Sequence, residues 1–157
     1  MKFSLIGSCV VLALFSVPLA HAHPDAKATS RIGCVLTDVE DRSVWVTVPV
    51  VAADAMEYQG VGEFQIYHPL TRQMEMQGAN AQVQFQLRAD AQGMRQLSQL
   101  SIGLGRSGQF SVQITDLETG EGTYQNAVFG STLPRSGAVN CTFHEYVKPR
   151  PALSGGN

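Results

Sequence analysis

The chain has 157 residues, of which 15% are charged, with 11 lysines and arginines against 13 aspartates and glutamates. This slightly acidic balance, without a basic stripe, argues against a nucleic-acid-binding protein. Uncharged side chains carry most of the polarity, chiefly glutamine, of which thirteen lie between Gln59 and Gln125.

Residues 1–22 are predicted to be a secretory signal peptide. Lys2 provides the positive charge, an apolar stretch follows, and Ala20-His21-Ala22 has the A-x-A form of a cleavage site. No charged stop-transfer segment comes next, so we expect no membrane insertion after cleavage. Removal of the signal leaves 157 − 22 = 135 residues beginning at His23, the size of one domain. The expected location is the periplasm.

Two cysteines, Cys34 and Cys141, remain after cleavage. In an oxidising compartment they are expected to pair, closing a loop of 141 − 34 = 107 residues. The chain has no C-x-x-C motif, so we interpret this disulfide as structural and not as a redox-active pair.

Most of the domain alternates apolar and polar residues with period two, which is typical of half-buried antiparallel strands. In chain order, we expect strands at residues 32–37, 44–50, 63–67, 73–77, 81–88, 100–104, 109–115, 123–129 and 139–147. The apolar positions predict an inward-facing core of Val46, Val48, Phe64, Ile66, Val83, Phe85, Leu87, Leu100, Ile102, Val112 and Ile114.

Segments rich in turn-forming residues separate these strands, among them Gly78-Ala79-Asn80. Residues 52–59 and 91–97 could each form a helical turn or a loop. Eight or nine short strands at this spacing indicate a sandwich or a barrel. This β domain is expected at 31–147, between a flexible segment at 23–30 and a disordered tail at 148–157.

No catalytic signature is present. The segment 103–108 matches G-x-G-x-x-G, but a strand pattern follows it where the dinucleotide fingerprint requires a helix, so we interpret it as a turn. The chain lacks a G-x-S-x-G elbow. We therefore expect neither enzymatic activity nor a cofactor.

Copper binding is an alternative function. After cleavage, the terminal amine and imidazole of His23 could chelate copper, with His68 or His144 as a third nitrogen ligand. Met74 and Met76, which we expect on one face of a strand, could hold Cu(I). The competing interpretation places His23 in a tail and both methionines in the core.

Glutamines concentrate on the faces of two predicted strands that point away from the core. This face is either a solvated surface or a neutral hydrogen-bonding platform for an extended, polar, amyloid-prone chain. For the second case the candidate contact residues are Gln82, Gln84, Gln86, Arg88, Gln109 and Gln113.

From Cys34 to Phe129 the chain resembles the periplasmic curli-assembly inhibitors of the CsgC/CsgH type. The segments that carry the resemblance are residues 34–36, 44–51, 62–67, 77–78, 81–87, 100–105, 109–116 and 123–129. These inhibitors are small proteins that keep an amyloid subunit from polymerising before export. The resemblance implies an all-β, immunoglobulin-like antiparallel β-sandwich of 7–9 strands. It also implies a monomeric, chaperone-like function toward a curli-type subunit. A structural subunit of a surface appendage or adhesin is the remaining alternative.

Overall fold

The computed structural model describes residues 28–37, 42–68, 71 and 73–147. The predicted signal peptide, His23 and the predicted C-terminal tail lie outside this range. The described residues form a short 3₁₀ turn, η1 (Gly105–Ser107), and eight strands. The strands are β1 (Thr29–Leu36), β2 (Ser43–Pro49), β3 (Glu57–His68), β4 (Gln73–Ala89), β5 (Arg95–Gly103), β6 (Gln109–Asp116), β7 (Glu121–Asn126) and β8 (Ser136–Val147).

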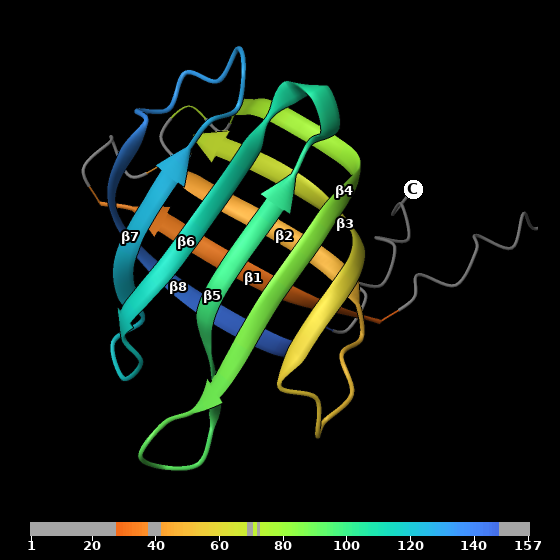
Figure 1. Ribbon diagram of the computed structural model, residues 1–157, viewed down its shortest axis with the longest axis vertical. Helices are drawn as coiled ribbons and strands as arrows, with labels where there is room; N and C mark the ends of the chain where they lie inside the picture. Colours follow the sequence, from red (N-terminus) through yellow and green to blue (C-terminus); the bar gives the residue numbers. More distant parts are fainter. Residues whose placement is uncertain (1–27, 38–41, 69–70, 72, 148–157) are drawn as a thin grey trace, which may run out of the picture.

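These strands form one closed antiparallel barrel in sequential order, in which β8 returns to pair with β1 (Figure 1). The expected immunoglobulin-like sandwich is therefore wrong. Registered pairs such as Cys34 with Cys141 and Leu36 with Val139 join the first strand to the last. A sandwich keeps two separate sheets, whereas this ladder closes one sheet on itself. The alternating pattern could not distinguish them, because strands of both architectures bury one face.

The expected turn at residues 78–80 is also wrong, because β4 continues through it as a single strand. On β3, Gly62 pairs with Ala81 and Phe64 pairs with Gly78, so two residues of β4 lie opposite one residue of β3. Asn80, with a φ of 59°, is one of these two residues of β4. Such a bulge bends a strand without ending it, so glycine and asparagine mark a bend here and not a turn.

Neither ambiguous segment forms a helix. Within residues 52–59, β3 begins at Glu57, and within residues 91–97, β5 begins at Arg95. The turn before β5 is organised by Asp90, whose Oδ1 accepts hydrogen bonds from the N–H groups of Gln92 (2.9 Å) and Met94 (2.8 Å). The Gln96 side chain donates to Asp90 Oδ2 (3.1 Å), and together these donors lower the pKa of Asp90.

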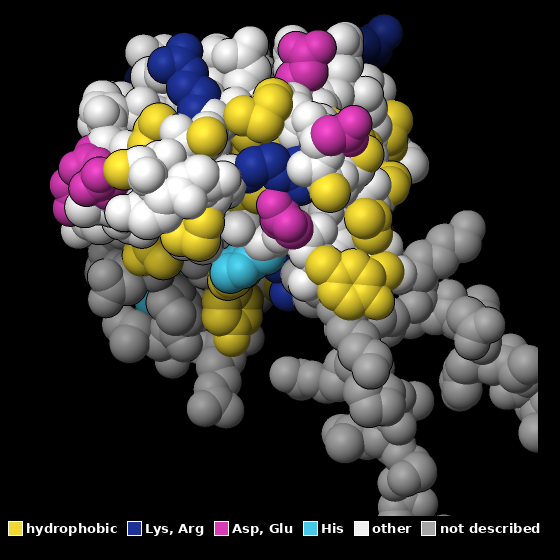
Figure 2. Space-filling model, turned by 90° about the horizontal axis from the view of Figure 1, so that it is seen from below, with side chains coloured by type: hydrophobic (Ala, Val, Ile, Leu, Met, Phe, Trp, Pro, Cys, Tyr) yellow, Lys and Arg dark blue, Asp and Glu magenta, His cyan; other side chains and the backbone are white. Residues whose placement is uncertain are grey.

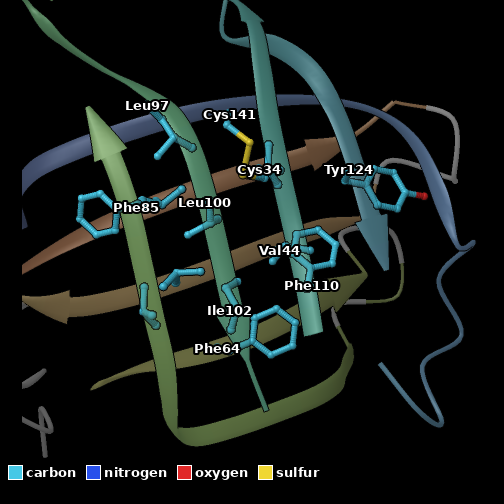
Figure 3. Close-up of a cluster of buried hydrophobic side chains, with 14 of the residues drawn as sticks. Cys34, Val44, Phe64, Phe85, Leu97, Leu100, Ile102, Phe110, Tyr124 and Cys141 are labelled. Atoms are coloured by element: carbon cyan, nitrogen blue, oxygen red, sulfur yellow. A yellow bond between two sulfur atoms is a disulfide. The ribbon is translucent and has the colours of Figure 1, made fainter. Parts of the chain in front are cut away.

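The interior of the barrel is filled by side chains, and the predicted core is confirmed at every position. Aromatic side chains from four strands contribute to it: Phe64, Phe85, Phe110 and Tyr124 (Figure 3). The Phe110 ring lies 5.7 Å from that of Tyr124 and 6.1 Å from that of Phe64, measured between ring centroids. An eight-stranded barrel can enclose a small ligand or be filled by its own side chains, and this one is filled.

The predicted disulfide between Cys34 and Cys141 is confirmed. The two Cα atoms lie 4.1 Å apart on paired positions of β1 and β8, and both side chains are buried inside the barrel (Figure 3). The bridge thus lies within the ladder that closes the barrel. A disulfide in the core indicates an oxidising, extracytoplasmic compartment.

Side chains cover the end of the barrel at which β3 and β5 begin, with a basic and an acidic group side by side among hydrophobic ones (Figure 2). Arg95 Nη1 donates to the carbonyl oxygens of Ala52 (2.7 Å) and Ala55 (2.6 Å). Its Nε donates to Glu145 Oε1 (2.8 Å), and its guanidinium lies 5.8 Å from the ring centroid of Phe143. These contacts tie β5 to β8 and to the β2–β3 connection.

Among the described residues, no helix is long and apolar enough to cross a membrane.

Candidate partner-binding surface

The glutamines of β4 point out of the barrel, because successive side chains of a strand alternate between its two faces. Val83, Phe85 and Leu87 are buried, and the residues between them are exposed. All six predicted contact residues are exposed on the outer face: Gln82, Gln84, Gln86 and Arg88 on β4, and Gln109 and Gln113 on β6.

Strand register brings these separate positions into one surface. Gln86 pairs with Gln99 of β5, which pairs with Gln113 of β6. In the next row, Gln84 pairs with Ser101 of β5, which pairs with Ser111 of β6. We call this outward-facing set the glutamine surface: Gln59 on β3; Gln82, Gln84, Gln86 and Arg88 on β4; Gln99 and Ser101 on β5; Gln109, Ser111 and Gln113 on β6; and Thr123 and Gln125 on β7. It spans five adjacent strands (Figure 1).

Hydrogen bonding divides the glutamine surface into two parts. On β6, Gln109 Nε2 donates to Ser101 Oγ (2.7 Å), and Gln113 Nε2 donates to the carbonyl oxygen of Ser98 (3.3 Å). Within the described part of the chain, the side-chain amides of the three β4 glutamines have no hydrogen-bond partner. These β4 amides therefore offer donors and acceptors that only solvent or a bound partner can satisfy.

Several members of this surface were not predicted as contact residues. Gln99 escaped the pattern because β5 has a bulge opposite β4. Gln86 pairs with Gln99 and Leu87 pairs with Leu97, so Ser98 is an extra, buried residue that breaks the alternation. Ser101, Ser111 and Gln125 do alternate with buried neighbours, so the same period-two signal could have found them.

The ligands predicted for copper do not come together in the part of the chain that the structure describes. His68 is buried, and its Nδ1 accepts a hydrogen bond from the Thr71 N–H (3.4 Å), whereas His144 is exposed on β8. Met76 packs against the core, and Met74 is 50% exposed. No group of three histidine, cysteine, aspartate or glutamate side chains in the described residues could hold a metal ion.

The G-x-G-x-x-G segment forms a turn between β5 and β6, as predicted from the strand pattern that follows it. The Leu104 N–H donates to the Gly108 carbonyl oxygen (2.8 Å) across η1. Gly108 has a φ of 101°, and a Cβ there would lie 2.1 Å from the Ala127 carbonyl oxygen. The glycine is needed for this turn and for the close approach of the loop after β7.

Comparison of the chain with protein-family models, with curated proteins and with solved structures gives no match. The resemblance to the curli-assembly inhibitors therefore stays a prediction from the sequence. The closed barrel differs from the sandwich that this resemblance implies. Function must accordingly be inferred from the surface of the barrel itself.

Proposed function

We propose that this protein is a non-enzymatic, periplasmic, chaperone-like inhibitor that contacts a curli-type amyloid subunit through the glutamine surface. The observation that supports this proposal is the continuity of uncharged polar side chains across β3 to β7. Each glutamine amide offers two N–H donors and a carbonyl acceptor, so such a surface can hydrogen-bond to a polar chain whatever its charge.

The packed interior supports an external binding site. Phe64, Phe85 and Phe110 are each at most 1% exposed and occupy the space that a small ligand would need. A partner must therefore bind to the outside of the barrel. The outer face of the sheet offers an extended client a continuous surface, because strands β3 to β7 are paired in order along it.

Transient contact of this kind acts on early assemblies and does not need to hold every client monomer. We expect the mature protein, well below one molar equivalent, to lengthen the lag phase of fibre formation by the subunit from its own organism. Thioflavin fluorescence would measure the lag. An unchanged lag at an equimolar ratio would refute the chaperone proposal.

Sedimentation of the protein alone is expected to show a monomer, whereas filaments would support a structural subunit.

The choice of surface can be tested by changing its charge. Replacing Gln82, Gln84 and Gln86 with glutamate should preserve the fold, because these side chains face solvent. It should shorten the lag toward that of an acidic client alone, through like-charge repulsion. The matched control, Val35→Glu with Thr37→Glu and Thr142→Glu, adds the same charge on β1, on the residue that follows it and on β8, behind β4 to β6 in Figure 1. Equal effects of the two triple variants would contradict this choice of surface.

A further inference from the structure

One half of β3 has a neighbour on one side only. The ladder between β2 and β3 ends where Thr47 pairs with Glu63, whereas the ladder between β3 and β4 continues to Glu57. In the same register, Pro49 would lie opposite Val61. Proline has no N–H to donate, which accounts for the end of the β2–β3 pairing at this point.

The hydrogen-bonding pattern between β3 and β4 shows which backbone N–H and C=O groups of β3 point away from β4, toward the open side. The Leu87 N–H donates to the Met56 carbonyl oxygen (2.7 Å), so Met56 faces β4. Because successive residues alternate in direction, Glu57, Gln59 and Val61 point their N–H and C=O groups away from β4. A hydrogen bond from the Tyr58 hydroxyl to the Val61 carbonyl oxygen (3.0 Å) supports this phase.

A groove of about 540 Å³ adjoins one end of this edge, at Val61. Val61, Gly62 and Glu63 line one side of it, and Thr29, Arg31 and Pro49 line the other. The far wall belongs to β1 and β2, which are paired with each other, and β2 extends only by Val48 and Pro49 beyond its pairing with β3. The groove therefore suits a single added strand better than the paired edge of a second barrel.

The first half of β4 also lacks a second neighbour, because β5 begins to pair only at Gln82. There, side chains from other elements cover the strand. Thr132 Oγ1 donates to Glu75 Oε2 (2.9 Å), and Arg42 lies 3.4 Å from the other carboxylate oxygen. Arg42 Nη1 also donates to Thr132 Oγ1 (3.1 Å). On the open edge of β3, the Tyr58 hydroxyl is the one described side chain that hydrogen-bonds an outward backbone group.

We propose that the open edge of β3 binds a single extended peptide segment, rich in uncharged polar residues and free of acidic ones, as an added β-strand. The backbone N–H and C=O groups of Glu57, Gln59 and Val61 would pair with it. Two carboxylates, those of Glu57 and Glu63, flank the site against one guanidinium, that of Arg31, and this net negative charge disfavours acidic peptides. Side chains of the added strand would continue the polar row beyond Gln59. This inference depends on the open edge alone and not on the amyloid proposal.

The Tyr58 hydroxyl already hydrogen-bonds one of the outward acceptors, the Val61 carbonyl oxygen. Its ring stacks on Phe85, 5.2 Å away between centroids, and passes over Gly60, where a Cβ would lie 2.5 Å from the hydroxyl oxygen. The Tyr58 hydroxyl is protonated and donates at neutral pH, as any tyrosine is, and burial raises its pKa further. A peptide N–H would compete with this hydroxyl for the Val61 carbonyl oxygen. Tyr58→Phe is therefore expected to tighten peptide binding by a few fold.

The binding test uses the mature protein and an acetylated, amidated heptapeptide of alternating threonine and glutamine with a central lysine. In a nitrogen-15 NMR titration, we expect the amide signals of Glu57, Gln59 and Val61 to shift. N-methylation of the alternate peptide amides that face β3 should abolish binding, whereas methylation of the other amides should not. Shifts confined to the β4 to β7 residues of the glutamine surface, or equal effects of the two methylation patterns, would overturn the proposal.

A pair of variants tests the same edge from the protein side. Gln59→Pro removes an outward N–H without touching the β3–β4 ladder, and should weaken binding about tenfold. Gln59→Ala keeps that N–H and should stay within about twofold. Equal affinities of the two variants would contradict the proposal.

A variant that starts at Ala28, which also lines the groove, tests whether the chain itself occupies the site. Binding by this shortened chain alone would assign the groove to residues 23–27 and overturn the proposal.

Discussion

Replacing Phe85 with alanine is expected to lower the free energy of unfolding by about 3–5 kcal/mol. Phe85 is 1% exposed, and its ring lies between those of Tyr58 and Phe143, with centroids 5.2 Å and 5.7 Å away. The barrel is closed and already filled, so its walls cannot collapse fully onto the space that the ring leaves. The cost therefore includes both the lost burial of the ring and the remaining cavity.

Gln84→Ala is the matched control, because Gln84 precedes Phe85 on β4 and points to the opposite face. Its truncation should change stability by no more than about 0.5 kcal/mol. Urea unfolding followed by tryptophan fluorescence would measure both variants, since Trp45 is the one tryptophan of the chain. Comparable losses for Gln84→Ala and Phe85→Ala would mean that β4 does not face inward at Phe85.

The alternation that predicts this contrast in stability is a local property, and it identified the core and the outward glutamines correctly. Closure of the barrel is not local. It depends on pairing between β1 and β8, which are separated by most of the chain, and on bends that let one sheet curve until its ends meet. The bulge at Asn80 is one of these bends. Its segment contains glycine and asparagine, which are also typical of turns, so the sequence alone does not distinguish the bend from a turn.

The candidate surface was predictable strand by strand but not as a whole. Alternation alone places Gln84 and Gln113 outside the barrel. The rows that join them depend on register across β5, and that register shifts at the buried Ser98. The open edge of β3 was hidden for a different reason. The sequence predicts a helical turn or a loop at residues 52–59, and the glycines that follow at positions 60 and 62 interrupt the alternation, although Gly60 makes room for the Tyr58 ring.

The second large effect is expected at the disulfide, whose loss should lower the free energy of unfolding by about 2–5 kcal/mol. The bridge closes a loop of 107 residues, and for a loop of about 100 residues the chain-entropy model gives about 4.7 kcal/mol. Its position adds a local consequence. Cys34 and Cys141 lie within the ladder that joins the two ends of the sheet, so this ladder loses its covalent link when the bridge is absent.

Two forms of the protein separate the cross-link from packing. Cys34→Ala combined with Cys141→Ala removes both the link and two buried sulfur atoms, whereas protein refolded and kept under reducing conditions retains the sulfur atoms. If the link dominates, the two forms should have similar stabilities in urea, both well below that of the oxidised protein. Hydrogen exchange should then accelerate more at Gly33 and Thr142, whose amides are in phase with the Thr37–Ala138 hydrogen bond between β1 and β8, than at Leu100 and Val112, which are paired between β5 and β6. Equal acceleration in both ladders would show that the bridge stabilises the barrel only globally, and an unchanged stability would show that β1–β8 pairing closes the barrel without it.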